Sequence, residues 1–236
     1  MLCARGEDCA ILFARTPQPG RVKSRLWSHL TPEQACRFHC ASTSDMAELL
    51  DRSLPGVPQW LFFSEAPVPE PGHGGLPLPA SFRCAVQEGN TLGERMSHAF
   101  ARALDGGARR VVIFGSDSPT LPPSLVPQAF QSLTECDLVL GPTEDGGYYL
   151  IGCRWFDPGL FANVEWGTHR VFDETHANAQ RLGYRMAVLP PWFDLDEWKD
   201  VERLLAEAGR GTALPSHLAA FFGQLNFLEE KFRWEL

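Results

Sequence analysis

The feature that most constrains the fold of this chain is the alternation of short apolar runs with longer helix-like segments. The apolar runs lie at residues 9–15, 60–64, 110–114, 137–140, 148–153 and 186–189, with a weaker one ending near residue 86. Segments with helical signals separate most of them, at 31–50, 92–103, 124–133, 168–182 and 197–208. Strands that alternate with helices of this length predict an α/β fold of three layers, with a mostly parallel central sheet and helices on both faces.

Local capping signals support several of these helices. Thr31 is followed by a proline and, three residues on, by Gln34, which is the pattern of a capping box. The segment 92–103 carries apolar residues at three- and four-residue spacing and stops at Gly106 and Gly107. Thr168 is predicted to cap the helix that runs to residue 182.

The chain of 236 residues is predicted to form a single domain over residues 1–236, because it contains no internal repeat, charge block or linker. The Pro- and Gly-rich segment 66–80 is expected to be a surface loop. The segment 213–236 is expected to be an aromatic, helical C-terminal extension. Such an extension needs an apolar surface to lie on, and the body of the protein is favoured over a partner.

Composition excludes several classes of protein. A net charge of −8 has the wrong sign for broad binding to nucleic acid, where phosphates must be neutralised. No apolar run approaches the ~18–20 residues that span a bilayer, and residues 1–10 carry charges where a signal peptide is apolar. Seven scattered cysteines without a Cys-x-x-Cys pair indicate reduced thiols. We therefore expect a cytoplasmic protein, and its oligomeric state stays open.

A basic loop follows the first predicted strand. Arg15 ends the strand, and Gly20 opens a turn that is followed by Arg21, Lys23 and Arg25. Backbone amides of a glycine turn, together with lysine and arginine side chains, offer convergent donors to a di- or triphosphate. The alternative is a solvated basic loop. The loop is not a Walker A loop, because a valine precedes the lysine.

Carboxylates follow two other predicted strands. Asp117 comes directly after the strand at 110–114, and Asp194 and Asp196 follow the strand at 186–189. Because the carboxyl ends of parallel strands meet at one edge, Asp117 and Asp194 are expected to hold one divalent cation, Mg²⁺ or Mn²⁺, against a pyrophosphate group. A turn or helix-cap role is the alternative for each, and for Asp196 capping of the helix near residue 197 is the favoured interpretation.

A glycine-rich turn forms a further candidate site. Asp145, Gly146 and Gly147 precede Tyr148, and the two glycines permit a tight turn or the close approach of a ligand. Asp145 could then hold the hydroxyl groups of a sugar. A plain β-hairpin explains the same residues equally well.

Taken together, these segments resemble a bacterial family of glycosyltransferases with the GT-A, or nucleotide-diphospho-sugar transferase, fold. The resemblance runs from about residue 9 to residue 205. The motifs that carry it are Phe13-Ala14-Arg15, Pro19 to Leu26, Leu92-Gly93-Glu94-Arg95-Met96, Gly115-Ser116-Asp117-Ser118-Pro119, Gly141-Pro142, Asp145 to Leu150, Trp166-Gly167-Thr168 and Asp194-Leu195-Asp196. The lysine loop is also similar to that of phospholactate guanylyltransferases, which share the fold.

The resemblance implies a nucleotide bound in the amino-terminal half, a divalent cation on Asp117, and an acceptor pocket built from the second half. The catalytic residues expected on this basis are Lys23, Asp117 and Asp194. The expected nucleotide-binding residues are Ala14, Arg15, Gly20, Lys23, Arg25, Gln87, Gly89 and Ser116. The expected substrate-binding residues are Asp145, Gly146, Gly147 and Tyr148.

Three functions remain open at this point. The first is a metal-dependent transferase that moves a sugar from a nucleotide-diphosphate donor to a small acceptor. The second is a nucleotidyltransferase that uses a nucleoside triphosphate and releases pyrophosphate. The third is a nucleotide-sugar-binding protein without turnover, for which nucleotide binding would be indifferent to Mg²⁺ and to the change Asp117→Ala.

Overall fold

The computed structural model describes residues 2–66 and 76–225 of the chain. Its strands are β1 (Asp8–Ala14), β2 (Gln59–Phe63), β3 (Phe82–Val86), β4 (Arg110–Gly115), β5 (Leu138–Pro142), β6 (Tyr148–Cys153) and β7 (Met186–Val188). Its helices are α1 (Pro32–Ser53), α2 (Leu92–Asp105), α3 (Leu125–Ser132), α4 (Val171–Arg181), α5 (Trp198–Gly209) and α6 (Ser216–Gln224). Two short 3-10 helices are η1 (Ser24–Leu26) and η2 (Pro158–Phe161).

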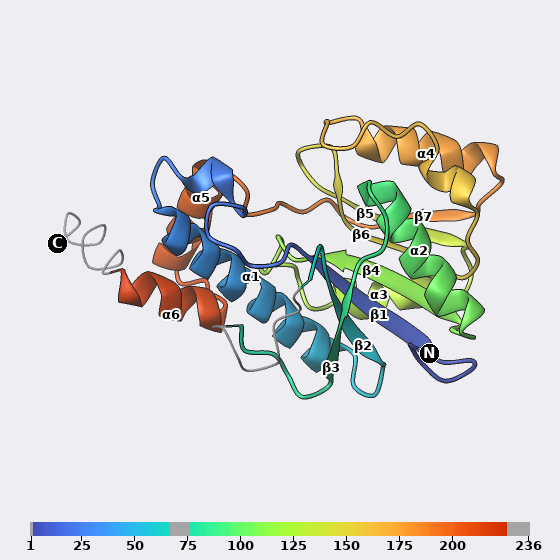
Figure 1. Cartoon of the computed structure of the whole chain (residues 1–236), viewed down its shortest axis with the longest axis horizontal. Helices are drawn as coiled ribbons and strands as arrows, with labels where there is room; N and C mark the ends of the chain where they lie inside the picture. Colours follow the sequence, from blue (N-terminus) through green and yellow to red (C-terminus); the bar gives the residue numbers. More distant parts are fainter. Residues whose placement is uncertain (1, 67–75, 226–236) are drawn as a thin grey trace.

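The strands form one seven-stranded sheet in the order β3-β2-β1-β4-β6-β5-β7 (Figure 1). Neighbours pair in parallel except for β6, which is antiparallel to both β4 and β5. The carboxyl ends of β1, β2, β3, β4 and β5 therefore share one edge of the sheet. Because β6 runs the opposite way, the turn that joins β5 to β6 lies at this edge too.

Two apolar layers cover the faces of this sheet. The alternation of β1 shows how they form, since Leu12 packs in the layer that contains α1 and α3, whereas Ile11 packs in the layer that contains α2, η2 and α4. Successive side chains of a strand point to opposite faces, so a run of apolar residues buries both. The predicted α/β fold with helices on both faces is confirmed.

A third apolar cluster fixes the segments after β7 against the outer side of α1. Phe38 of α1 packs edge-on against Phe221 and Phe222 of α6, with ring centroids 5.6 and 6.2 Å apart. Asp45 of α1 accepts hydrogen bonds from the backbone amides of His217 and Leu218 and so caps α6. Residues 216–224 thus lie on the body of the protein, whereas the predicted extension beyond residue 225 is outside the described residues.

Most predicted element boundaries agree with the structure to within a few residues, and the capping box of Thr31 and Gln34 is formed. Two details differ. Helix α4 begins at Val171 with Arg170 as its N-cap. Thr168 does not cap it, because its hydroxyl oxygen accepts the amide of Arg170, which precedes the helix, while the hydroxyl donates to the carbonyl of Glu165. Part of the predicted surface loop, residues 67–75, lies outside the described residues.

Among the described residues, no helix is both long and apolar enough to cross a membrane. All seven cysteines are free thiols, as the absence of paired spacing predicted.

Candidate functional site

A cleft of about 1060 Å³ opens at the carboxyl edge of the sheet. We refer to it as the carboxyl-edge cleft. It is lined by the ends of β1 and β4, by the loop before η1, by the turn between β5 and β6, and by residues 166–169 and 194–196. The candidate residues that line it are Ala14, Arg15, Lys23, Arg25, Gln87, Ser116, Asp117, Asp145, Gly147, Tyr148, Asp194 and Asp196.

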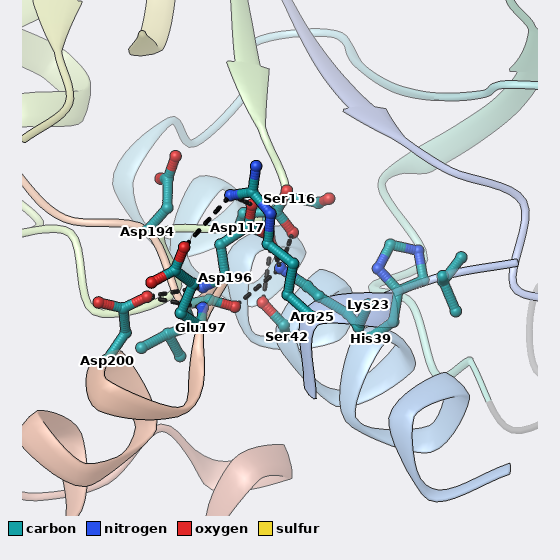
Figure 2. Close-up of polar contacts among 12 residues, drawn as sticks. Lys23, Arg25, His39, Ser42, Ser116, Asp117, Asp194, Asp196, Glu197 and Asp200 are labelled. Carbon is teal, nitrogen blue, oxygen red and sulfur yellow. Dashed lines mark hydrogen bonds and ion pairs between the residues drawn. The ribbon is translucent and has the colours of Figure 1, made fainter. Parts of the chain in front are cut away.

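Lys23 is the most enclosed charged group of the cleft. Its Nζ lies 2.7 Å from Asp117 Oδ1 and 3.0 Å from Asp196 Oδ1, and it donates a hydrogen bond of 2.8 Å to the carbonyl of Leu195 (Figure 2). Only 4% of its side chain is exposed. Burial lowers the pKa of this ammonium group, but the two carboxylates outweigh burial and raise the pKa above its usual value. Lys23 is therefore fully charged.

Asp117 follows β4 and is held at both its backbone and its side chain. Its carbonyl accepts a hydrogen bond of 2.8 Å from the amide of Leu195, which ties the end of β4 to the segment that carries Asp194. Burial raises the pKa of its carboxyl, but Lys23 and His39 lower the pKa below the usual value overall. Oδ1 is buried, yet 40% of the side chain is exposed. One side of this carboxylate thus contacts Lys23, and the other faces the cleft.

Asp194 is the second carboxylate of the cleft. Its Oδ1 accepts a hydrogen bond from the hydroxyl of Ser118. Burial raises the pKa of this carboxyl to about 7, and the nearby charge of Asp117 adds to the rise. Near neutral pH, a large fraction of Asp194 is therefore protonated.

These two carboxylates fit a divalent cation. Asp117 and Asp194 present hard oxygen donors to the same space, and each disfavours the charge of the other, as the raised pKa of Asp194 records. Mg²⁺ and Mn²⁺ prefer oxygen ligands and are commonly bound by one or two carboxylates together with substrate phosphates. A cation placed here would relieve the repulsion.

Asp196 does not cap helix α5, contrary to the favoured interpretation of the sequence. The N-cap residue is Glu197, and Asp200 completes the capping box. The carboxylate of Asp196 instead contacts Lys23 at 3.0 Å and Arg25 at 3.4 Å. The physical reason is the segment 23–25, at the start of η1, which brings two cations next to this side chain.

The other cations of the loop are more exposed. Arg25 also lies 3.7 Å from Glu197, and Arg21 forms an exposed ion pair of 3.0 Å with Glu65. Arg15 is exposed on the cleft wall. Gly20 adopts a φ of 77°, which favours glycine, but it lies outside the cleft lining. The guanidinium groups thus face solvent at the mouth of the cleft, where a phosphate can reach them.

In this structure, the polar groups of Gln87 and Gly89 form hydrogen bonds with other protein atoms. The amide of Gln87 is buried and donates to the carbonyls of Ala14, at 3.3 Å, and Phe62, at 2.8 Å. The carbonyl of Gly89 accepts from Arg95 Nε at 3.0 Å, and Gly89 does not line the cleft. Ser116 lines the cleft, and its carbonyl accepts from the hydroxyl of Ser42 at 2.7 Å.

The turn between β5 and β6 is built around Asp145. Its Oδ1 accepts hydrogen bonds from the hydroxyl of Thr143, at 2.5 Å, and from the amide of Gly147, at 3.1 Å. Gly146 has a φ of 91°, and its carbonyl accepts from the amide of Phe172. Burial raises the pKa of the Tyr148 hydroxyl above its usual value. Asp145, Gly147 and Tyr148 line the cleft, whereas Gly146 shapes the turn behind them.

Several residues of the cleft had no role in the sequence analysis. His39 of α1 is buried, and its Nε2 donates to the carbonyl of Arg15 at 2.9 Å. Burial lowers the pKa of its imidazole, so the ring is neutral at neutral pH. Arg95, Trp166 and His169 also line the cleft. The motifs at 92–96 and 166–168 were visible in the sequence, but nothing in their spacing showed which side chain would face the cleft.

A second acidic cluster lies outside the cleft. Asp45, Glu48 and His217 bring ligand-type atoms within 4.8 Å of one another. His217 Nε2 lies 2.8 Å from Glu48 Oε1, and both oxygens of Asp45 accept backbone amides of α6. These contacts attach α6 to α1, so the cluster has a structural explanation.

Sequence and structure comparisons place the chain among known proteins. A protein-family model described as "Uncharacterized protein conserved in bacteria (DUF2064)" matches residues 53–168. The crystal structure of a "putative nucleotide-diphospho-sugar transferase from Desulfovibrio desulfuricans G20" is 31% identical in sequence, with a TM-score of 0.83, and the match covers 96% of this chain and 98% of that one. No curated protein matches the sequence.

More distant solved structures share the fold. The CMP:2-keto-3-deoxy-manno-octonic acid synthetase complexed with CTP matches with a TM-score of 0.54 and 9% identity, over 88% of this chain and 100% of that one. The 4-diphosphocytidyl-2C-methyl-D-erythritol synthase from Anaerococcus prevotii DSM 20548 matches with a TM-score of 0.52 and 11% identity, over 86% and 96%. At these identities the likeness concerns the fold alone.

Proposed function

The chain belongs to the same family as the Desulfovibrio desulfuricans protein, and from that premise we propose that it is a metal-dependent transferase that uses a nucleotide-diphosphate-sugar donor. The observation that carries the proposal is the carboxyl-edge cleft. There, cations from residues 15–25 and carboxylates from residues 117 and 194 line one space of about 1060 Å³. A diphosphate and its cation are the ligand whose charges complement this arrangement.

In this proposal the basic loop binds the diphosphate of the donor. Arg15 and Arg25 are exposed at the cleft and offer planar donors to phosphate oxygens, while Lys23 adds a point charge. Gly20 allows the loop to turn back toward the strand. The nucleoside lies against the ends of β1 and β4, at Ala14 and Ser116. Gln87 and Gly89 act indirectly, because their polar groups hold the backbone of this wall.

Asp117 and Asp194 hold the divalent cation, Mg²⁺ or Mn²⁺. The cation supplies positive charge that stabilises the departing diphosphate. The bond from the anomeric carbon to the phosphate oxygen breaks, a bond from the acceptor oxygen to that carbon forms, and the acceptor proton is released. The acceptor is a small molecule that lies near Asp145, Gly147 and Tyr148, on the side of the cleft built from the second half of the chain.

A nucleotidyltransferase is the second candidate, and the fold favours it as a rival. The two distant neighbours named above are described as synthases or synthetases of cytidylyl products, one of them complexed with CTP. In that reaction an acceptor oxygen attacks the α-phosphate of a nucleoside triphosphate, and the bond to the β-phosphate breaks. Pyrophosphate then leaves, instead of a nucleoside diphosphate.

The identity of the released group tests the proposal. The protein is incubated with Mn²⁺, a panel of acceptors and either NDP-sugars or NTPs, and nucleoside diphosphate and pyrophosphate are measured separately. Acceptor-dependent release of a nucleoside diphosphate supports the proposal, whereas release of pyrophosphate from an NTP supports the rival. Nucleotide binding without turnover that ignores Mn²⁺ contradicts both and indicates a binding protein.

Asp117→Asn tests the assignment of the site in the same assay. We expect at least a 100-fold loss of turnover, because the removed charge would stabilise the cation and the leaving group. Asp105→Asn is the matched control, because Asp105 is an exposed carboxylate at the end of α2 and lies outside the cleft. Equal activity of the two variants would contradict the proposed role of Asp117.

A further inference from the structure

The proposed function gives Lys23 and Asp117 different partners, yet the structure pairs them with each other. The function requires Lys23 on a phosphate and Asp117 on a cation. In the structure, three protein oxygens lie within 3.0 Å of Lys23 Nζ: Asp117 Oδ1, Asp196 Oδ1 and the carbonyl of Leu195. Two of these oxygens, Asp196 Oδ1 and the carbonyl of Leu195, accept hydrogen bonds from the ammonium group, and Asp117 Oδ1 forms an ion pair with it.

The backbone at Lys23 is also unusual. Its φ of 50° and ψ of 42° are left-handed, and among the described residues only Asn163 shares a positive φ without being a glycine. Asparagine adopts this region readily, whereas lysine does not. The contacts of the side chain therefore hold the loop in a disfavoured conformation. A loop held in this way can relax when those contacts are exchanged for others.

Within the described residues, the carboxylate of Asp196 contacts the basic loop. It does not cap α5, and its two oxygens face Lys23 at 3.0 Å and Arg25 at 3.4 Å. Figure 2 shows the side chain of Lys23 pointing toward Asp117 and Asp196, and Arg25 in contact with Asp196. The positive end of Lys23 thus lies against the same carboxylate that the proposed function assigns to the cation.

We propose that Lys23 is a built-in counter-ion that occupies the cation position next to Asp117 until a diphosphate draws it away, with Asp196 as its docking group. The divalent cation then binds together with the nucleotide and only weakly without it. This inference rests on the proposed function, because it takes from it the assignment of Asp117 to the cation.

The first test measures binding of Mn²⁺ alone, without any nucleotide, by titration calorimetry. Lys23→Met is expected to bind Mn²⁺ at least tenfold more tightly than the unmodified chain, because it vacates the position next to Asp117. Arg25→Met is the matched control: it removes the same charge from the same loop, but Arg25 contacts Asp196 and not Asp117. We expect less than a threefold change for it. No tightening in Lys23→Met, or equal tightening in both variants, overturns the inference.

The second test measures binding of inorganic pyrophosphate alone, which probes the diphosphate site whatever the base. Asp196→Asn removes the docking group, so Lys23 becomes available and pyrophosphate affinity is expected to rise at least fivefold. Glu197→Gln is the control, because it removes one negative charge at the adjacent position. The carboxylate of Glu197 contacts Arg25 and Lys199 but not Lys23. An equal rise in both variants would show a charge effect alone and would overturn the docking role.

A third measurement needs no variant and remains available if Lys23→Met fails to fold. The chain contains three lysines, at positions 23, 199 and 231. Lys199 is 75% exposed and serves as the internal reference. Labelling with acetic anhydride, read by mass spectrometry, should modify Lys23 at least tenfold more slowly than Lys199, and Mn²⁺ alone should not change that ratio. Equal labelling of the two, or release of Lys23 by Mn²⁺ alone, contradicts the inference.

Failure of this inference and failure of the proposed function give different results. If Asp117→Asn abolishes Mn²⁺ binding to the nucleotide-loaded protein but Lys23→Met does not tighten binding of Mn²⁺ alone, only the inference fails. If Asp117→Asn leaves Mn²⁺ binding to the loaded protein unchanged, the cation assignment and the proposed function fail with it.

Discussion

At the scale of single residues, environment separates the roles of chemically identical side chains. Asp117 and Asp194 are both aspartates at one edge of the sheet, yet the pKa of Asp117 lies below the usual value and that of Asp194 rises to about 7. Burial raises the pKa of Asp194, whereas at Asp117 the direct contact with Lys23 helps to outweigh the effect of burial. A cation site with one ionised and one partly protonated carboxylate must therefore lose a proton when the cation binds.

The raised pKa of Asp194 predicts a cost in stability above neutral pH. Between pH 4 and 7 the carboxyl is ionised in the unfolded chain but protonated in the folded one, so the free energy of unfolding falls as pH rises through this range. Asp194→Asn removes this cost. At pH 8 with EDTA we expect the variant to be more stable by roughly 1–3 kcal/mol, and at pH 4 the difference should vanish.

Urea unfolding of both proteins across this pH range measures that difference. Asp105→Asn, at an exposed carboxylate, should show no such trend. A difference between Asp194→Asn and the unmodified chain that is independent of pH would contradict the account of Asp194.

Gln87 supports a second prediction at this scale. Its buried amide donates to the carbonyls of Ala14 and Phe62 and so links the ends of β1, β2 and β3. Gln87→Leu leaves both carbonyls without this donor and should cost about 1–3 kcal/mol in the free energy of unfolding. The preference of the Gln87→Leu variant among nucleotide bases, measured by thermal shift with UDP, CDP, GDP and ADP, should equal that of the unmodified chain. A changed preference at unchanged stability would instead show direct contact with the base.

At the scale of elements, the turn between β5 and β6 carries one side of the cleft. Gly146 has a positive φ of 91°, and a Cβ at this position would collide with the backbone carbonyl of His169. Backbone cannot move aside as easily as the end of a side chain. The loop at residues 166–169 and the turn at 145–147 are therefore packed together through this glycine, and both line the cleft.

Gly146→Ala should therefore lower the free energy of unfolding far more than Gly183→Ala, which also places an alanine at a positive φ. Gly183 has a φ of 76° with nothing within 4 Å of the position of a Cβ, so Gly183→Ala reports the backbone cost alone, about 1 kcal/mol. We expect Gly146→Ala to cost at least about 2 kcal/mol more, since packed groups must shift. Thermal unfolding of both variants measures the difference, and equal shifts in melting temperature would contradict this packing.

The elements were largely predictable from sequence, because their signals are local. The apolar run of β1 and the capping box of Thr31 need only neighbouring residues, and both formed as predicted. The predicted start of α4 at Thr168 is wrong, because Thr168 lies in a turn where its oxygen accepts the amide of Arg170 and its hydroxyl donates to the carbonyl of Glu165. The role of Asp196 was also missed, since its partner Lys23 lies 173 residues away in the chain.

At the scale of the whole molecule, the cleft depends on the order of the strands. β1 and β4 are neighbours in the sheet although their first residues, Asp8 and Arg110, are 102 positions apart in the chain, so the loop after β1 meets Asp117 after β4. The segment after β7 reaches the same place because the amide of Leu195 donates to the carbonyl of Asp117. The sequence predicted that these charges share one edge, but not that Lys23 would be buried between two of the carboxylates.

Under the proposed function, this arrangement couples nucleotide binding to cation binding. A ligand present at 100 times its dissociation constant stabilises a folded protein by about 2.7 kcal/mol. We expect an NDP-sugar with Mn²⁺ to raise the melting temperature by more than the sum of the two separate shifts, because each ligand neutralises charge that opposes the other. Shifts that merely add would contradict coupling between the two sites.

The most direct measurement of the central claim is calorimetric titration of Mn²⁺ into the nucleotide-saturated protein, for the unmodified chain, Asp117→Asn and Asp194→Asn. If Asp117 and Asp194 hold one cation against the diphosphate, the unmodified chain binds one Mn²⁺, and each variant loses at least tenfold in affinity. Mn²⁺ affinity that is the same in all three proteins would contradict a cation site at the carboxyl edge of this sheet.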